Sequence, residues 1–206
     1  NADDRPAMPT RPTAMFELHF ATLLLAMAGV LAKFTALPEP AIVLGRSAIA
    51  APALAAILAL RGRRLSPDSP RAAVALIVTG ALLAGHWLTF FLAIRTATMA
   101  VGILVLFTFP VITALLEPLA FRERLRRRTV LNGLVVLVGL YFVVGEFDPT
   151  SDALRGAGWA ILSALIYTAR NLMTRRLVGD RDGALVMGWQ VAAAAIVMIP
   201  IVLLDP

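Results

Sequence analysis

Long apolar segments alternate with short polar connections along almost the whole chain. A helix needs ~20 mostly apolar residues to cross a hydrocarbon core of ~30 Å. By this measure we predict seven membrane-spanning helices, with approximate bounds Phe16–Leu37, Ala41–Leu60, Ala72–Arg95, Met99–Ala120, Thr129–Gly145, Arg155–Thr174 and Gly183–Leu204. Backbone groups cannot go unpaired in lipid, and the alternation typical of barrel strands is absent. The predicted fold class is therefore an all-α polytopic membrane protein.

Arginines gather in the connections on one side of the predicted bundle. Connection 61–71 carries four of them and connection 121–128 carries five, and further arginines on this side are Arg5, Arg11, Arg175, Arg176 and Arg181. The opposite side has the turn 38–40, with two prolines, and the acidic stretch 146–154. Cytoplasmic loops are rich in Lys and Arg. We therefore expect a multi-pass protein of the cytoplasmic (inner) membrane with its N-terminus in the cytoplasm.

Composition supports a membrane protein and excludes several other classes. Hydrophobic residues make up 59% of the 206 and charged residues 16%, against about half and a quarter in soluble domains. The net charge of +6 lies in clusters between apolar segments, so nucleic acid is not an expected partner. Without cysteine there is no disulfide framework or thiolate metal site. Residues 1–15 are polar, contain three prolines and are expected to form a disordered cytoplasmic arm.

Lys33 and Arg46 interrupt the first two apolar segments, within "VLAKFTALPEPAIVLGRSAIA" (residues 30–50). Ionisable residues inside a membrane are costly and often functional. Both would lie only ~6–8 Å below the outer interface, so their long side chains could also reach water. Two interpretations stay open: interfacial cations, or a cationic pair in an outward-opening cavity that attracts a carboxylate, a phosphate or the acidic end of a zwitterion.

His86 is the deepest ionisable residue of the third predicted helix, ~13 Å from its outer end. It lies too deep and is too short to reach water. Trp87 and Phe90 provide aromatic surface beside it. An imidazole bonded to a neighbouring helix is one interpretation. A substrate contact or a proton carrier is the other, because histidine titrates near physiological pH.

Three further polar positions are candidates. Glu117 lies about one turn from the inner end of the fourth helix, where it could reach water, pair with Arg122 or Arg124, or form an inner polar contact. Gln190 is expected at mid-depth in the outward half of the seventh helix. Arg170 lies about one turn from the inner end of the sixth helix.

Catalytic and metal-binding motifs are absent from the sequence. There is no nucleophile elbow, HExxH or P-loop, and no second His or carboxylate stands at metal-ligand spacing from His86. We therefore expect neither an enzyme nor a cofactor, and proton coupling through His86 or Glu117 stays open.

Small residues and prolines recur inside the predicted helices. Gly80 and Ala84 form a small-xxx-small pair of the kind that lets helices approach closely. Pro52, Pro110 and Pro200 each free a carbonyl and bend a helix, which suits either static packing or a gating element.

Three stretches together resemble the EamA-type branch of the drug/metabolite transporter superfamily. The first is "AKFTALPEPAIVLGRSAIA", with a Lys late in one helix and an Arg early in the next. The second is "GHWLTFFLAIRTATMAVGILVLFTFPVITALLEPLAFRERL", with a mid-helix proline (Pro110) and a Glu after the helix (Glu123). The third is the Gly-spaced "LNGLVVLVGLYFVV" followed by "LRGAGWAILSALIYTARNLMTRR".

This resemblance implies two inverted five-helix repeats, ten helices in all, with alternating access around a central cavity. The first repeat would cover residues 16–146, and residues 155–206 would begin the second, inverted repeat. The sequence stops after seven helices, so we expect a fragment of a longer protein.

We therefore expect a secondary transporter that exports a small metabolite or drug-like solute, with the lipid bilayer as its surroundings. Its expected substrate contacts are Lys33, Arg46, His86, Trp87, Phe90, Glu117 and Gln190. The competing class is a non-transporting scaffold or sensor with the same bundle, in which interhelical partners satisfy every midplane polar group. A homodimer stays open.

Overall fold

The computed structural model describes residues 15–16, 18–20, 22–24, 27, 30, 34–122, 125, 127–144, 150–178 and 181–204. The chain divides into two compact units, residues 1–36 and residues 37–206. In the first unit, the described residues between 15 and 34 are helical. Nine of the 22 residues of the predicted first helix, including Lys33, lie outside the described residues, as does most of the predicted N-terminal arm.

The second unit consists of helices, and no strand occurs among its described residues. The helices are α2 (Glu39–Leu60), α3 (Pro70–Thr96), α4 (Met99–Leu106), α5 (Phe109–Phe121), α6 (Arg127–Val144), α7 (Asp152–Val178) and α8 (Gly183–Leu204). These elements match the second to seventh predicted helices, the fourth being divided into α4 and α5. The predicted all-α fold class is confirmed.

Helix starts coincide with capping residues and prolines in the sequence. The Ser69 hydroxyl accepts a hydrogen bond from the Ala72 amide (3.2 Å) at the start of α3, where Pro70 occupies the first turn. The Thr98 hydroxyl accepts a bond from the Val101 amide (3.2 Å) at the start of α4. Such caps satisfy amides that have no partner within the helix.

Four helical segments of the described chain are long and apolar enough to span a membrane: α2, α3, the segment Met99–Phe121 and α8. The helices α6 and α7 also occupy predicted spans, but α6 begins with two arginines and α7 carries several charges. Large apolar side chains cover the outside of these helices; Ile49 is 74% exposed and Phe142 is 75% exposed. Such a surface suits lipid and would be a liability in water.

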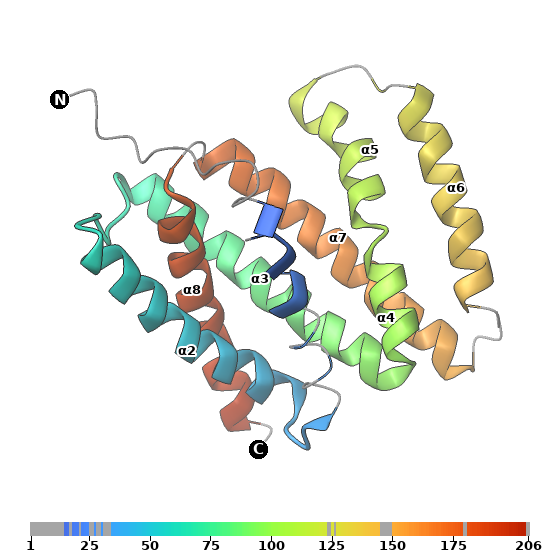
Figure 1. Cartoon of the computed structure of the whole chain (residues 1–206), viewed down its shortest axis with the longest axis horizontal. Helices are drawn as coiled ribbons and strands as arrows, with labels where there is room; N and C mark the ends of the chain where they lie inside the picture. The colour runs from blue at the N-terminus through green and yellow to red at the C-terminus, as the bar shows by residue number, and fades with distance from the viewer. Residues whose placement is uncertain are drawn as a thin grey trace. The chain divides into compact units, whose positions relative to one another are not determined.

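Helices α3 and α7 pack along each other, with α2 and α8 on one side and α4, α5 and α6 on the other (Figure 1). Small residues allow the closest approaches. A Cβ added to Gly80 of α3 would lie 2.6 Å from the Ala193 Cβ and from the Gln190 carbonyl oxygen of α8. The expected role of Gly80 in close helix packing is therefore confirmed.

The fourth predicted span breaks at residues 107–108, just before Pro110. Proline has no amide hydrogen and its ring crowds the carbonyl four residues earlier, which favours a break here. The Thr108 amide bonds to the Val105 carbonyl (3.0 Å), a tighter turn than an α-helix makes. Proline alone does not break a helix in this protein, because α2 and α8 continue through Pro52 and Pro200.

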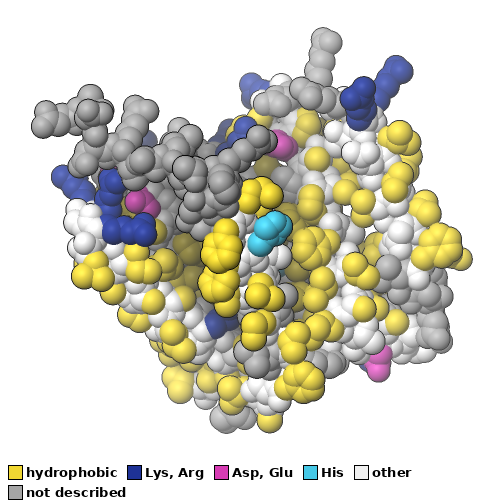
Figure 2. Space-filling model, in the orientation of Figure 1, with side chains coloured by type: hydrophobic (Ala, Val, Ile, Leu, Met, Phe, Trp, Pro, Cys, Tyr) yellow, Lys and Arg dark blue, Asp and Glu magenta, His cyan; other side chains and the backbone are white. Residues whose placement is uncertain are grey.

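The arginine-rich connections meet at one end of the second unit. Arg181 pairs with Asp68 (3.0 Å), and the Trp189 indole donates to the Leu65 carbonyl (2.8 Å). We call this the basic end; the end with Glu39 and Arg95, paired at 3.1 Å, is opposite. In Figure 2, Lys and Arg side chains gather mainly at one edge, whereas hydrophobic side chains cover the helix flanks. That the basic end faces the cytoplasm stays a prediction.

Candidate functional site

Arg46 of α2 points toward α3. Its guanidinium carbon lies 4.1 Å from the ring centroid of Trp87 and 5.9 Å from that of Phe91. A guanidinium over an aromatic face is attracted by the ring's electron density, more strongly when water is excluded. The side chain is half-buried and makes this contact on a neighbouring helix. Its expected partner Lys33 lies outside the described residues, so the predicted cationic pair stays a prediction.

His86 of α3 is hydrogen-bonded to Ser163 of α7. Its Nδ1 lies 2.8 Å from the Ser163 hydroxyl and 3.2 Å from the Ser163 carbonyl oxygen. A carbonyl only accepts, so Nδ1 carries the hydrogen in this geometry and Nε2 remains an acceptor. The Ser163 hydroxyl in turn donates to the His86 carbonyl (2.8 Å). The interhelical bond considered for His86 is present, and Nε2 has no partner among the described residues.

Aromatic rings continue this cluster toward the break between α4 and α5. The Tyr167 ring lies 4.5 Å from the His86 ring, and the Phe109 ring meets Tyr167 edge-on at 4.8 Å. Phe90 lies 6.5 Å from His86 and 5.6 Å from Phe91. The rings therefore connect α3, α5 and α7 through contacts of the usual offset or edge-on kind.

Arg170 is only 8% exposed, deeper than expected, because α7 continues to Val178. Its guanidinium donates to the side-chain oxygens of Gln190 and Asn171, the latter at 3.0 Å. Its Nε is buried without a partner. Both acceptors are neutral amides. Arg170 is thus a buried cation held by neutral groups.

Gln190 links three helices and is fully buried. Its amide nitrogen donates to the hydroxyls of Thr79 (2.8 Å) and Thr174 (3.1 Å) while its oxygen accepts from Arg170. The expected place in the outward half of the helix does not agree with a basic end that faces the cytoplasm. Gln190 lies ~10 Å from the start of α8, which begins at the basic end, as the neighbouring Trp189 shows.

Glu117 of α5 pairs with Arg175 of α7. The expected partner Arg122 follows the end of α5 in a left-handed turn (φ 58°), whereas α7 packs directly against α5. Arg124 lies outside the described residues. Arg175 also stacks on Phe121, 4.6 Å from its ring centroid. Glu117 is thus engaged near the basic end, away from His86.

The polar side chains follow one another along the bundle. Arg46 lies ~10 Å from the end of α2 that bears Glu39, His86 lies ~15 Å from the same end of α3, and Arg170 lies ~12 Å from the basic end of α7. We call the series Arg46, Trp87, His86, Ser163, Tyr167, Arg170 and Gln190 the polar track.

Carboxylates are missing from the polar track. Within the described part of the chain, Glu39, Asp68, Glu117 and Asp152 each pair with an arginine at a helix end, and Asp182 accepts from the Ala184 amide. None of these five groups contacts Arg46 or Arg170. The described His, Asp and Glu residues also form no cluster able to hold a metal ion.

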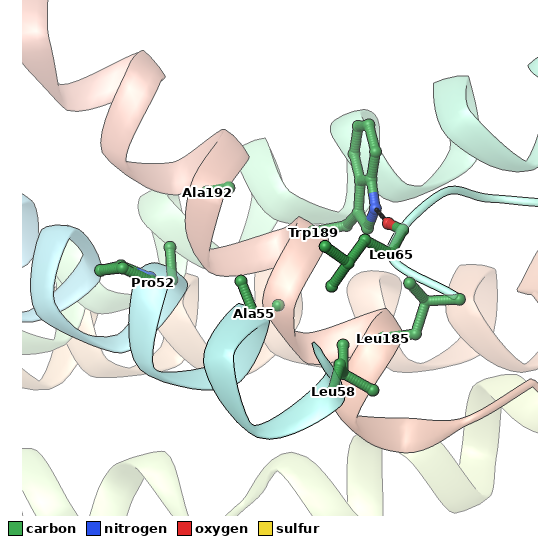
Figure 3. Close-up of a pocket in the computed structure, with 9 residues that line it drawn as sticks. Pro52, Ala55, Leu58, Leu65, Leu185, Trp189 and Ala192 are labelled. Carbon is green, nitrogen blue, oxygen red and sulfur yellow. Dashed lines mark hydrogen bonds between the residues drawn. The ribbon is translucent and has the colours of Figure 1, made fainter. Parts of the chain in front are cut away.

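An apolar cavity of about 330 Å³ lies elsewhere, between α2 and α8 near the basic end (Figure 3). Pro52, Ala55 and Leu58 line one side and Leu185 and Trp189 the other. It contains no residue of the polar track, and its walls offer little to orient a polar solute.

Sequence patterns did not identify Ser163 or Tyr167 as site residues and gave no role to Arg170. A hydroxyl in the middle of an apolar helix was the available signal for Ser163 and also for Thr79, which packs against Gln190. Such residues often bond only to their own helix, as Thr89 does to the Gly85 carbonyl (2.8 Å). Spacing alone therefore could not assign their partners.

Comparison with known proteins agrees with the membrane fold. Residues 14–145 match the model of the EamA-like transporter family. No curated protein and no solved structure matches the chain. The family match extends over more than half of the 206 residues and includes Arg46, His86, Trp87, Phe90 and Glu117. The chain belongs to the EamA-like transporter family.

Proposed function

We propose that the protein is a secondary transporter that exports a small metabolite or drug-like solute by alternating access. Family membership supports a membrane transporter. The preference for an anionic solute rests on the guanidiniums of Arg46 and Arg170 in the polar track. No described carboxylate neutralises either of them. These cations favour a solute that bears a carboxylate or a phosphate.

The cost of a buried charge is the physical basis of this proposal. Moving an ion from water into a protein interior costs several kcal/mol unless a counter-charge and hydrogen bonds offset the loss. Neutral amides and an aromatic face offset part of that cost at Arg170 and Arg46. An anionic solute would supply the missing charge in the low-dielectric interior, where the interaction is strong.

The candidate residues take distinct roles in this proposal. Arg46, stacked on Trp87, would attract the anion from the end opposite the basic end. His86 would offer Nε2 as an acceptor to a donor group of the solute, and Phe90 would cover its apolar part. Gln190 would keep Arg170 oriented. Lys33 stays a candidate for a second cation that attracts the solute, and Glu117 would hold α5 against α7 at the basic end.

Alternating access needs an element that can change its bend, and the break between α4 and α5 suits this role. Its two halves already have separate hydrogen-bond ladders, so a hinge there breaks few bonds. The Thr108 hydroxyl at the break is buried without a partner, and the Phe109 ring beside it touches Tyr167 of the polar track.

Proton coupling through His86 remains part of the proposal because Nε2 is an acceptor.

Transport by the purified protein in liposomes tests this function. Labelled solutes are trapped inside the liposomes and their release or exchange is measured. We expect carboxylates and organophosphates to leave or exchange faster than matched neutral amides or alcohols. Arg46→Gln and Arg170→Gln should each slow the anionic solutes at least about tenfold, the loss of one charge-assisted contact. Arg63→Gln, at the basic end outside the polar track, is the matched control.

The competing scaffold or sensor class gives a different result. The bonds of His86 to Ser163 and of Gln190 to Arg170 are interhelical polar contacts of the kind that such a protein would have. If no solute of the panel crosses the membrane or raises the melting temperature of the protein, the transporter proposal fails, because a ligand stabilises the state that it binds. Equal rates for anionic and neutral solutes would refute the anion preference alone.

A further inference from the structure

A second cavity, of about 340 Å³, opens between the first turns of α3 and the last turns of α7. It lies at the basic end, separate from the polar track and from the apolar cavity of Figure 3. Arg71, Arg176 and Arg181 line it together with apolar residues of both helices. We call it the basic groove.

The rim of the basic groove carries more positive than negative charge. Arg181 is neutralised by Asp68 (Nε to Oδ2, 3.0 Å). Arg71 has no hydrogen-bond or ion-pair partner within the described chain, and Arg176 has only a long bond to the Ala120 carbonyl (3.5 Å). Among the described residues, two guanidiniums from different helices therefore line the groove without a carboxylate partner. Planar guanidiniums match the oxygens of phosphate, which they bind through paired hydrogen bonds.

The wall of the basic groove is apolar and faces outward. Val74 is 60% exposed and Val78 is 41% exposed, and both lie on the same stripe of α3 as Arg71. Val74 lies ~4.5 Å and Val78 ~10 Å farther from the helix end than Arg71. Leu177 of α7, 48% exposed, lines the groove beside Arg176. Because α3 is long and apolar enough to span a membrane, we expect this exposed wall to face the hydrocarbon of the bilayer.

This order of groups, cations at the helix end and apolar residues deeper, matches the order of groups in a phospholipid. The start of α3 adds to it, since its first turn contains no acidic residue and the helix dipole favours an anion there. A small inorganic anion would use the arginines but would leave the apolar wall unused. Basic pockets between membrane helices can bind anionic headgroups.

We propose that the basic groove binds the phosphodiester headgroup of an anionic phospholipid. Arg71 and Arg176 contact the phosphate, and the first part of an acyl chain lies along Val74 and Val78. The bound lipid bridges α3 and α7, and its binding does not depend on which solute the protein transports.

Native mass spectrometry of the detergent-purified protein tests this proposal. Phosphatidylglycerol should bind and remain attached under conditions that remove phosphatidylcholine. The double variant Arg71→Gln/Arg176→Gln should bind phosphatidylglycerol about 30-fold more weakly, given ~1 kcal/mol for each arginine near an anionic headgroup. The control Arg63→Gln/Arg64→Gln removes the same amount of charge at the basic end, outside the groove, and should bind like the unaltered protein.

A second pair of variants tests the apolar wall without changing charge. Val78→Trp fills the groove and should weaken phosphatidylglycerol binding, whereas Ile77→Trp, on an exposed position outside the groove, should not. Equal binding of the two lipids, equal loss in the arginine double variant and its control, or full displacement of the lipid by millimolar inorganic phosphate would each overturn the proposal. The last result would indicate a site for free anions.

Discussion

The guanidinium of Arg170 in α7 and the side-chain oxygen of Gln190 in α8 are joined by a hydrogen bond inside the bundle. Arg170 is 8% exposed and Gln190 is fully buried. The positive charge is therefore surrounded by neutral acceptors in a region with little water. A cation without a counter-ion among the described residues therefore joins α7 to α8.

Replacing Gln190 by Glu places a carboxylate on Arg170. We expect Gln190→Glu to raise the melting temperature, because the buried cation gains a counter-charge, and to lower the affinity for anionic solutes at least about tenfold, because their place is taken. Thermal unfolding and solute binding of the same preparation measure the two effects.

Gln190→Leu is the control for this substitution. It leaves Arg170 and the two threonine hydroxyls without their partner and should destabilise the protein by about 1–3 kcal/mol. A loss of stability in Gln190→Glu as large as that in Gln190→Leu would contradict the view that Arg170 lacks a counter-charge.

Ser163 is predicted to hold His86 in place. Ser163→Ala removes the hydroxyl that lies 2.8 Å from Nδ1 and 2.8 Å from the His86 carbonyl. We expect a loss of about 1–2 kcal/mol in the free energy of unfolding, measured by denaturant titration. Thr89→Ala, which removes a hydroxyl bonded only within its own helix, should cost less. An equal cost in both variants would argue against the interhelical bond.

The contact between α3 and α8 depends on the missing side chain of Gly80. In Gly80→Ala the new Cβ would meet the Ala193 side chain and the Gln190 backbone at 2.6 Å, so the helices must separate. We expect a marked fall in melting temperature and in the yield of folded protein. In Gly158→Ala nothing lies within 4 Å of the new Cβ, and stability should stay the same or rise. Similar melting temperatures for both variants would contradict this packing.

The contact of the Arg46 guanidinium with Trp87 should require an aromatic ring at position 87, but that ring need not be an indole. Trp87→Phe should keep most of the affinity for anionic solutes, whereas Trp87→Ala should lose the cation–aromatic contact and reduce affinity several-fold, corresponding to about 1–2 kcal/mol. Solute-dependent quenching of tryptophan fluorescence is unsuitable in these variants, so isothermal calorimetry measures the affinity. Equal losses in the two variants would show that the ring does not act through the guanidinium.

Several features of the candidate site were predictable from single positions. Arg46 and His86 stand out because charged or titratable residues are rare in apolar helices, and both make specific contacts on a neighbouring helix. Glu117 was expected near one helix end and is there, although its partner is Arg175 rather than a neighbour in the chain. Position along a span thus indicates depth, but it does not identify the facing helix.

Hydropathy by itself determined the helical fold and most helix positions in this protein. Lipid leaves no partner for backbone groups, so each long apolar segment must be a helix. The break between α4 and α5 was not predictable from proline alone, because Pro52 and Pro200 lie inside unbroken helices. The rotation of each helix was decided only by the tertiary structure. Both the lipid-facing and the buried sides of these helices are apolar, so no amphipathic pattern shows which side Arg170, Ser163 or Gln190 faces. Close packing of α3, α7 and α8 decides that these three residues join inside the bundle, because only small residues such as Gly80 allow the helices to meet there.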